Sequence, residues 1–349
     1  MNIDIQLVAQ SKIDSVDFNN LAFGRTFTDH MFVCDFSEGE WKNPTIMPYG
    51  PMLFDPSARV FHYGQAVFEG MKAFKDDNDD VFLFRPEDNF NRLNISAERL
   101  AMPAVAKEVF FEGLEKLLKI DNNWIKKGAG NALYIRPFII ATEGAIAASP
   151  AEAYKFIIIC SPAQSYYAGE VRVLFAEKYS RSADGGVGYA KAAGNYAAQF
   201  YPTRLANEQG FQQIIWTDAN SHEYLEEAGT MNIFFRIGDK LITTPTNDRI
   251  LDGITRKSII QLAEDNNINV HVRRVTVAEI KEAAKLGELK EIFGSGTAAV
   301  INPIKGFKHQ DDVFELPENN DSYATFFKEK LVNIQSNKTE DKHGWRVKI

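Results

Sequence analysis

The sequence contains few of the residues from which disulfide scaffolds and metal centres are built. Its 349 residues include only two cysteines, Cys34 and Cys160, which are far apart and form no CxxC or metal-ligand spacing. The six histidines form no HxxH or HExxH pattern. Disulfide scaffolding, structural zinc and metal catalysis therefore have no support in the sequence, and no metal is expected.

Long apolar runs and an excess of basic residues are also missing. No hydrophobic stretch approaches membrane-spanning length, and the segment from Met1 to Asp17 lacks the basic-then-apolar layout of a signal peptide. The formal net charge is −8. This disfavours a nucleic-acid partner, because binding phosphates requires a concentrated basic face. We predict a cytoplasmic protein with neither a membrane nor a nucleic-acid partner.

The length and the order of the periodic segments predict two α+β domains. A chain of 349 residues exceeds the usual single hydrophobic core, and strand-like runs mix with helical ones without regular βαβ alternation. A buried-strand pattern at Tyr154–Cys160 is followed by SPAQSYYAGE, in which Pro, Gly and Ser break any periodicity. We therefore predict a smaller N-terminal domain over residues 1–162, a linker over 163–173 and a larger C-terminal domain over 174–349.

Hydrophobic periodicity predicts the individual elements. Asn195 is the expected N-cap of one helix and Gly210 its end, and Pro202 should kink or break it. Helices are expected over residues 90–100, 109–120 and 195–210 and from about residue 255, and strands over 81–84, 133–140, 154–160, 171–175, 214–217 and 231–237.

One lysine has unusual neighbours. Lys191 lies in GYAKAAGNY and is the only charged residue between Gly185 and Gly194. Small neighbours allow other groups to approach the lysine closely, so its amine should be partly desolvated. Desolvation disfavours the charged ammonium form and lowers the pKa, and the neutral amine is the form that attacks a carbonyl. A solvent-exposed lysine in a loop is the alternative, and for a lysine considered alone it is the better interpretation.

Two adjacent carboxylates precede an apolar strand. Glu226 and Glu227 lie in EEAGTMN, just before MNIFF. A carboxylate that enters a strand end can hold a buried cation, and because strand side chains alternate, only one of the two need point inward. A solvated turn is the alternative interpretation.

Two glycine-containing segments and two arginines could bind anions. Gly253–Thr255 precedes a helix, whose first amides and dipole attract anions, and Gly294–Thr297 follows an apolar run where amides could converge. Each signal is weak alone, because glycine in turns usually serves turn geometry.

Two arginines have unusual surroundings. Arg92 lies in NFNRLN, and Arg136 is embedded in the apolar run YIRPF. For Arg136 a bound carboxylate or phosphate and an internal salt bridge are about equally supported.

In this order, the segments resemble the branched-chain aminotransferases, which are fold type IV pyridoxal-phosphate enzymes. The resemblance covers nearly the whole chain apart from the two tails. It implies a two-domain α+β fold, with the active site at the domain interface and pyridoxal 5′-phosphate as cofactor. The motifs that carry it are FGRTFTDHM (23–31), HYGQAVFEGMKAF (62–74), NRL (91–93), YIRP (134–137), YAKAAGNY (189–196), EEAGTMN (226–232), DGITR (252–256) and FGSGTAAV (293–300).

The resemblance implies cofactor roles residue by residue. Lys191 corresponds to the catalytic lysine that carries the cofactor as an imine and moves the proton between the substrate Cα and the cofactor C4′. Glu227 corresponds to the carboxylate paired with the pyridine nitrogen. Tyr196 corresponds to the phenol bonded to the cofactor O3′, and Arg92 to the arginine that binds the phosphate. Further cofactor contacts are implied for Thr230, Asn232, Ile254, Thr255 and Thr297.

Substrate roles follow in the same way. The turn at Thr297–Ala298 corresponds to the one that binds the substrate α-carboxylate, and Arg136 with Tyr63 to the pair that receives a second carboxylate. Ile146 and Ala148 correspond to a loop that reaches across a homodimer, and Ala148 is smaller than the usual valine there. The aromatic wall that accepts a branched side chain corresponds to Phe27, Tyr63, Phe68, Tyr134 and Tyr166.

The implied function is exchange of amino groups between branched-chain L-amino acids (Leu, Ile and Val) and 2-oxoglutarate by a homodimer. An apolar pocket separates these amino acids only weakly, by about 1–3 kcal/mol per methylene. The CxxC pair of some mammalian members is absent from Ala299–Pro303, so thiol regulation there is not expected. Three alternatives remain: a D-amino-acid transaminase of the same fold, a non-catalytic paralogue that binds the cofactor, and an α+β protein that binds a phosphorylated metabolite at Gly253–Thr255.

Overall fold

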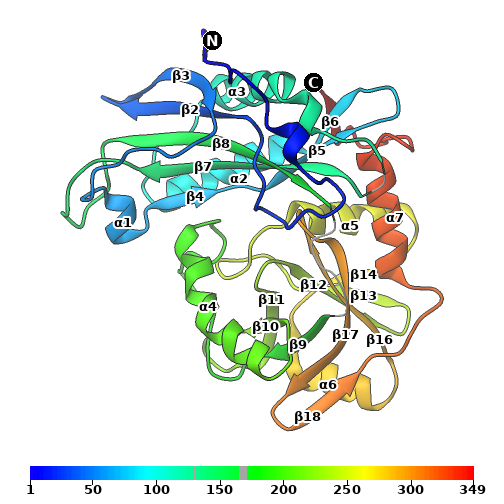
Figure 1. Cartoon of the computed structure of the whole chain (residues 1–349). Coiled ribbons are helices and arrows are strands. Elements are labelled where there is room, and N and C mark those ends of the chain that lie inside the picture. Colours follow the sequence, from blue (N-terminus) through cyan, green and yellow to red (C-terminus); the bar gives the residue numbers. More distant parts are fainter. Residues whose placement is uncertain (129, 165–170) are drawn as a thin grey trace. The chain divides into compact units, whose positions relative to one another are not determined.

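The computed structural model describes residues 1–128, 130–164 and 171–349 (Figure 1). Contacts between residues divide the chain into two units. Unit 1 comprises Met1–Tyr166, Ala190–Ala193 and Asn333–Ile349, and unit 2 comprises Tyr167–Tyr189 and Gly194–Val332.

Unit 1 is built on a nine-stranded sheet with the order β1-β3-β2-β8-β7-β5-β6-β19, and β4 pairs with β7 beside this path. The pairing of β1 with β3 is parallel, and the neighbouring pair β2–β3 is antiparallel. The strands are β1 (Asp4–Ile5), β2 (His30–Ser37), β3 (Glu40–Pro48), β4 (Ala66–Phe68), β5 (Met71–Lys75), β6 (Val81–Phe84), β7 (Ala132–Ala141), β8 (Tyr154–Ala163) and β19 (Arg346–Lys348), and the helices are α1 (Arg59–Tyr63), α2 (Pro86–Arg99) and α3 (Lys107–Ile120).

The core of unit 1 lies between its sheet and the helices α2 and α3. Phe110, Leu114 and Leu117 follow one another at helical spacing on α3 and are fully buried. Burying each such side chain contributes about 1.5–3 kcal/mol. Gly113 lies on α3 so close to the sheet that an added Cβ would be 2.7 Å from the ring of Phe32, so a larger residue would not fit without displacing that ring.

Unit 2 contains a ten-stranded sheet with the order β14-β13-β12-β16-β17-β9-β10-β11-β15, and β18 pairs with β17. A further pairing, Glu227 opposite Asn232, joins β11 to β12. It closes the part of the sheet that runs from β12 through β16, β17, β9 and β10 to β11 into a ring. The strands are β9 (Val171–Phe175), β10 (Gln213–Thr217), β11 (Tyr224–Ala228), β12 (Asn232–Ile237), β13 (Lys240–Thr243), β14 (Val270–Val272), β15 (Val275–Thr276), β16 (Leu289–Gly296), β17 (Val300–His309) and β18 (Asp312–Glu315). The helices are α4 (Ala193–Glu208), α5 (Ile254–Asp265), α6 (Val277–Lys285) and α7 (Tyr323–Gln335).

Two sheets with parallel and antiparallel pairs, accompanied by helices, confirm the α+β prediction. The strands predicted over 81–84 and 171–175 coincide with β6 and β9. Asn195 is wrong as an N-cap, because α4 begins at Ala193 and the Asn195 side-chain amide donates instead to the Val187 carbonyl at 2.8 Å. Of the kink or break predicted at Pro202, the break is wrong, because α4 continues to Glu208. Pro202 and Ala206 are buried on one face, so packing offsets the lost backbone hydrogen bond.

The division of the chain differs from the predicted boundaries in two places. β8 extends to Ala163 and β9 begins at Val171, so both ends of the predicted linker lie in strands. The segments 190–193 and 333–349, which the prediction assigned to the C-terminal domain, group with unit 1. Their contacts explain this, because the Phe68 N–H donates to the Lys191 carbonyl at 3.1 Å and β19 pairs with β6.

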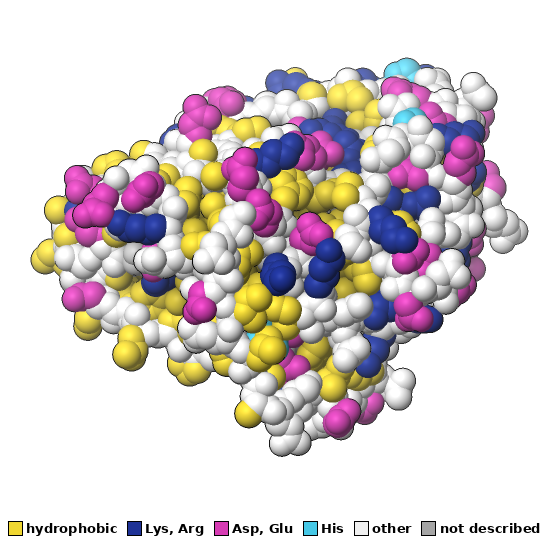
Figure 2. All heavy atoms as spheres, turned by 90° about the horizontal axis from the view of Figure 1, so that it is seen from above, with side chains coloured by type: hydrophobic (Ala, Val, Ile, Leu, Met, Phe, Trp, Pro, Cys, Tyr) yellow, Lys and Arg dark blue, Asp and Glu magenta, His cyan; other side chains and the backbone are white. Residues whose placement is uncertain are grey.

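Charged side chains of both signs lie together on the surface. On the face in Figure 2, Lys and Arg side chains are interspersed with Asp and Glu side chains, and hydrophobic side chains lie between them. No helix within the described part of the chain is long and apolar enough to cross a membrane.

Candidate functional site

Lys191 is held through its backbone between β4 and α2 of unit 1. Its N–H donates to the Ser96 Oγ at 2.9 Å, its carbonyl accepts from the Phe68 N–H, and Val67 forms a β-bridge with Ala192. Its Nζ lies 4.9 Å from the centroid of the Phe68 ring, a cation–π distance. The half-buried lysine thus lies against an aromatic surface, which favours the desolvated interpretation over the exposed loop.

A buried carboxylate that the sequence analysis missed belongs to the same cluster. Glu69 is 0% exposed and accepts hydrogen bonds from Arg92 Nε at 2.7 Å, Arg92 Nη2 at 2.9 Å and Asn89 Nδ2 at 2.7 Å. Burial alone would raise the pKa of the Glu69 carboxyl, but Arg92, Lys191 and Asn89 together hold it below its ordinary value of 4.5. The spacing of Asn89, Arg92 and Ser96 on one face of α2 is the signal that could have indicated a partner.

Arg136 and two predicted aromatic residues lie together with Lys191. The Arg136 guanidinium is 4.4 Å from the Phe68 ring and 5.3 Å from the Tyr134 ring, and its Nη2 donates to the Tyr134 hydroxyl at 3.0 Å. Within the described residues, the Arg136 Nε is buried and has no hydrogen-bond partner. An incoming carboxylate would satisfy this donor.

The other predicted substrate residues of unit 1 have contacts of their own. Phe27 stacks on Tyr49 with 4.6 Å between ring centroids. The Tyr63 hydroxyl donates to the Ile146 carbonyl, and Tyr63 is 47% and Ile146 71% exposed. Ala148 is also exposed. Tyr166 lies outside the described residues.

Glu227 is held through its carboxylate at the closure of the strand ring in unit 2. Its Oε1 accepts from Arg181 Nη2 at 2.6 Å and from the Leu251 N–H at 3.2 Å, and its Oε2 accepts from Asn232 Nδ2 at 3.1 Å. Glu227 is only 4% exposed. The ring closure explains the contact with Asn232, because β-bridge partners place their side chains on the same face. The buried carboxylate is suited to hold a cation or a protonated nitrogen.

The two adjacent glutamates are both buried in β11 and have different partners, as the alternation of strand side chains predicts, so the solvated-turn alternative is wrong. Glu226 is 3% exposed, faces the opposite side of β11 and pairs with Arg249, which also pairs with Asp184. Burial raises the pKa of the Glu226 carboxyl above its ordinary value of 4.5, although Arg249 opposes this shift. Both glutamates are buried because the segments carrying Arg249 and Asp184 cover the second face of the strand.

The start of α5 has the features of an anion site. Gly253 is its N-cap and offers no side chain to the first amides, and Ile254 and Thr255 are buried in the first turn. A Cβ on Gly253 would lie 1.8 Å from the Asn232 Oδ1, so glycine is required here. In the same turn, the Arg256 Nε is buried without a partner among the described residues, and burial lowers the Arg256 pKa. These groups fit a phosphate, as the Glu227 carboxylate fits a ring nitrogen.

The second glycine-containing segment lies at the end of a strand. Gly294 and Gly296 lie inside β16, and the turn begins only at Thr297. A Cβ on Gly294 would be 2.5 Å from the Met231 Sδ, so this glycine is needed for close packing, and the expected cradle of amides stays a prediction. Thr297 and Ala298 form the turn between β16 and β17, as the substrate prediction requires.

Tyr196 and Thr230 are brought together in unit 2. Tyr196 lies in the first turn of α4 and Thr230 between β11 and β12, and both line a cavity of about 290 Å³ with Gln199 and Gly229. The cofactor contacts that the resemblance implies for both residues stay predictions.

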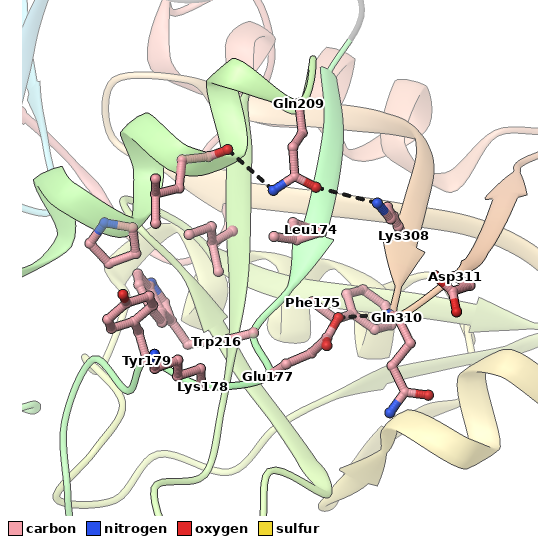
Figure 3. A pocket seen from close by; sticks show the side chains of 14 residues that line it. Leu174, Phe175, Glu177, Lys178, Tyr179, Gln209, Trp216, Lys308, Gln310 and Asp311 are labelled. Carbon is pink, nitrogen blue, oxygen red and sulfur yellow. Dashed lines mark hydrogen bonds between the residues drawn. The ribbon is translucent and has the colours of Figure 1, made fainter.

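A larger cavity in unit 2 is separate from the predicted site residues. It measures about 490 Å³ and is bounded by α4, β9, β10 and the segment between β17 and β18. In Figure 3, Gln209 and Lys308 meet across it at 3.3 Å, and the Gln310 N–H donates to Glu177 at 2.6 Å. The Trp216 Nε1 beside it is buried without a partner among the described residues. None of the predicted site residues is among its described lining.

The chain is similar to known enzymes over nearly its whole length. The family model for amino-transferase class IV matches residues 66–307. A probable branched-chain-amino-acid aminotransferase of Staphylococcus epidermidis is 45% identical over 349 residues, which cover 97% of this chain and 96% of the relative. Branched-chain-amino-acid aminotransferase 2 of Bacillus subtilis is 42% identical over 354 residues, with 99% and 97% covered.

A solved structure gives the same result for the fold. A branched-chain amino acid aminotransferase from T.th., complexed with N-(5'-phosphopyridoxyl)-L-glutamate, aligns with a TM-score of 0.70 at 21% identity, covering 90% of this chain and 97% of that chain. The same enzyme has also been solved with 4-methylvaleric acid. These similarities confirm the family and the fold class predicted from the motifs. The chain therefore belongs to the class IV aminotransferases and, within them, to the branched-chain-amino-acid aminotransferases.

Proposed function

We propose that this protein transfers the amino group of L-leucine, L-isoleucine and L-valine to 2-oxoglutarate, giving branched-chain 2-oxo acids and L-glutamate. The observation that carries the proposal is the identity of 42% and 45% to branched-chain aminotransferases over nearly the full chain. The ligands of the solved T.th. enzyme, a phosphopyridoxyl-glutamate and a branched aliphatic acid, support both halves of the exchange.

The proposed cofactor is pyridoxal 5′-phosphate, which when bound withdraws electrons from the substrate Cα. Lys191 would hold it through its Nζ and would move the proton at the substrate Cα, and the position of the Nζ against Phe68 gives it a partly apolar environment. Glu227 would keep the ring nitrogen protonated, and Tyr196 would donate to the O3′ oxygen. Arg92 would bind the phosphate, and further contacts would come from Thr230, Asn232, Ile254, Thr255 and Thr297.

The substrate carboxylates have two proposed binding places. The α-carboxylate binds at the Thr297–Ala298 turn, and the second carboxylate of 2-oxoglutarate binds at Arg136 and Tyr63. The buried Arg136 Nε, which lacks a partner among the described residues, supports this role. Arg136→Met should raise the KM for 2-oxoglutarate at least about tenfold, since a charge-assisted hydrogen bond is worth roughly 1.5–3 kcal/mol. The KM for L-leucine, measured in the same assay, should change much less, and equal changes would contradict the assignment.

The remaining parts of the substrate site come from aromatic residues and from a second copy of the chain. Phe27, Tyr63, Phe68 and Tyr134 form the wall for the branched side chain, together with Tyr166. We propose a cytoplasmic homodimer in which the loop with Ile146 and Ala148 reaches the partner's site. The 71% exposure of the apolar Ile146 side chain supports such a contact.

Chemical trapping of the lysine tests the proposed function most directly. Borohydride reduction of the purified yellow protein, followed by peptide mapping, should place the cofactor label on Lys191. Lys191→Ala protein treated in the same way is the control and should carry no stable label. Label on any other lysine would overturn the catalytic assignment. A colourless protein, or a yellow one that transaminates D-alanine but not L-leucine, would overturn the function itself.

A further inference from the structure

Arg181 makes the shortest described contact with Glu227 within unit 2. Its Nη2 lies 2.6 Å from the Glu227 Oε1, and its side chain is 7% exposed. The same guanidinium donates to the Gly188 carbonyl at 2.8 Å and to the Arg249 carbonyl at 3.2 Å. Two backbone carbonyls therefore fix the direction from which the positive charge approaches the carboxylate.

Nothing in the sequence indicates this contact. Arg181 lies in SRSADGG, a polar and glycine-rich segment that predicts a solvated loop. Burying an arginine without a partner would be costly, so its burial requires the Glu227 carboxylate and the two carbonyls. Without Arg181, the described hydrogen bonds to Glu227 in unit 2 would come from two neutral donors, Leu251 N–H and Asn232 Nδ2, and the charge of Arg256 would act on the carboxylate without a described hydrogen bond.

The neighbouring glutamate provides an internal comparison. Glu226 also pairs with a buried arginine, but Arg249 divides its charge between Glu226 and Asp184. The pKa of the Glu226 carboxyl is raised, chiefly by burial. Arg181 forms a described ion pair with Glu227, which also accepts from two neutral donors, whereas on Glu226 the charge of Arg181 acts only as a smaller effect that opposes the raised pKa. Two adjacent buried carboxyls thus have different electrostatic support.

We propose that Arg181 is a positioning residue of the transamination, which keeps Glu227 ionised so that the proton it shares with the cofactor's ring nitrogen stays on the ring. A cation at hydrogen-bond distance lowers the proton affinity of a carboxylate. The protonated ring is the better electron acceptor. The inference rests on the proposed function, because the ring nitrogen belongs to the proposed cofactor.

The first experiment uses the cofactor-free protein and depends only on the Arg181–Glu227 pair. The infrared spectrum of Arg181→Gln near pH 7 should contain the carbonyl stretch of a protonated carboxylic acid that the unsubstituted protein lacks. The double variant with Glu227→Gln should lose that band, which assigns it to Glu227. Arg181→Lys keeps a positive charge and should lack the band. If Arg181→Gln has no such band between pH 5 and pH 8 while its circular dichroism spectrum is native, Arg181 does not keep Glu227 ionised.

The second experiment observes the ring nitrogen itself. Protein loaded with ¹⁵N-labelled pyridoxal phosphate should give a protonated-nitrogen shift, and Arg181→Gln should move it toward the unprotonated value. The kcat with L-leucine should fall at least about tenfold, the ratio that one unit of proton affinity represents, and Arg181→Lys should restore most of it. Arg249→Gln is the matched control, because it breaks the pair on the other face of β11.

The possible outcomes distinguish a failure of the role proposed for Arg181 from a failure of the proposed transaminase function. An equal shift of the ring nitrogen in Arg249→Gln would overturn the specific role of Arg181. An unchanged nitrogen shift in Arg181→Gln would overturn it as well. If the unsubstituted protein binds no pyridoxal phosphate, the proposed function fails, and the infrared result still decides whether Arg181 controls the charge of Glu227.

Discussion

Lys191 in unit 1 and Glu227 in unit 2 are held in opposite ways. Lys191 is anchored through its backbone by Ser96 and Phe68, and its Nζ lies over an aromatic ring. Glu227 is anchored through its carboxylate oxygens by Arg181, Leu251 and Asn232. A group that carries a proton between atoms has to move, whereas a group that stabilises a fixed charge must already be in place. Each mode of anchoring therefore suits the role proposed for that residue.

The largest effect should come from removing the lysine side chain. Lys191→Ala should lower the transamination rate with L-leucine and 2-oxoglutarate at least about a thousandfold, as the loss of an essential covalent catalyst does. Unit 1 should remain folded, because the contacts of residue 191 with Ser96 and Phe68 use backbone atoms. Steady-state assays and thermal unfolding measure the two effects. Lys178→Ala, on an exposed lysine, is the control, and an active Lys191→Ala protein would reject the assignment.

The contact between Asn232 and Glu227 can be disrupted by a substitution that leaves both side chains unchanged. Gly253→Ala would place a Cβ 1.8 Å from the Asn232 Oδ1, and Asn232 cannot yield without losing its bonds to Glu227 and Leu251. Overpacking of this kind costs about 1–3 kcal/mol, which urea unfolding would measure. Gly50→Ala is the matched control, since nothing lies within 4 Å of its added Cβ. Equal stabilities of the two variants would mean that the start of α5 is more adaptable than the contacts indicate.

The hairpin that presents Glu227 depends on a third carboxylate. Burial would raise the pKa of Asp218, but hydrogen bonds from Tyr224, Ser221 and Glu223 lower it from 3.8 to about 2. Because the folded pKa is depressed, the stabilisation is complete above pH 3.8 and is lost as the pH falls through about 2.

Asp218→Asn should therefore cost about 1–2 kcal/mol of unfolding free energy at pH 7, and less at pH 3. Urea unfolding at several pH values measures this. Ser221→Ala removes one of the donors and should have a smaller effect of the same sign. A cost of Asp218→Asn that does not change between pH 7 and pH 3 would argue against ionisation as its origin.

The smallest effect should come from the backbone anchor of Lys191. Ser96→Ala removes the acceptor of the Lys191 N–H, and losing one hydrogen bond costs about 0.5–1.5 kcal/mol. Ser258→Ala removes an equally buried hydroxyl from α5. Both variants should lose similar stability, but only Ser96→Ala should slow the borohydride labelling of Lys191. Equal labelling rates would show that the Ser96 hydrogen bond is not needed to position the lysine.

Sequence reasoning found the elements whose pattern is local. β6 and β9 are short and mainly apolar runs, and α5 follows the glycine at its N-cap and buries Ile259 and Leu262, so each pattern lies within one segment. The failed N-cap at Asn195 has a physical cause, because its side chain bonds the Val187 carbonyl before the helix, a tertiary contact that outweighs local preference.

The reactive groups of the candidate site could be predicted from the sequence, but the residues that contact them and fix their positions could not. Lys191 and Glu227 lie in motifs with unusual composition, whereas Glu69 and Arg181 acquire their roles only from partners distant in the sequence. Nothing near Arg181 indicates that Glu227 will be its partner, because that pairing depends on how the loop before Lys191 packs on β11. The residues that hold a site in place are therefore harder to predict than the residues that react.

The pairing of β19 with β6 has a consequence for how the protein is made. β6 emerges from the ribosome early, and its four residues are all buried in the folded unit. The strand that covers its edge, Arg346–Lys348, is translated only after the whole of unit 2. Through most of translation, the nascent chain therefore carries an unpaired apolar strand edge of the kind that associates with other chains. Cellular yield should accordingly be sensitive to chaperone supply and to alterations of the β19 segment.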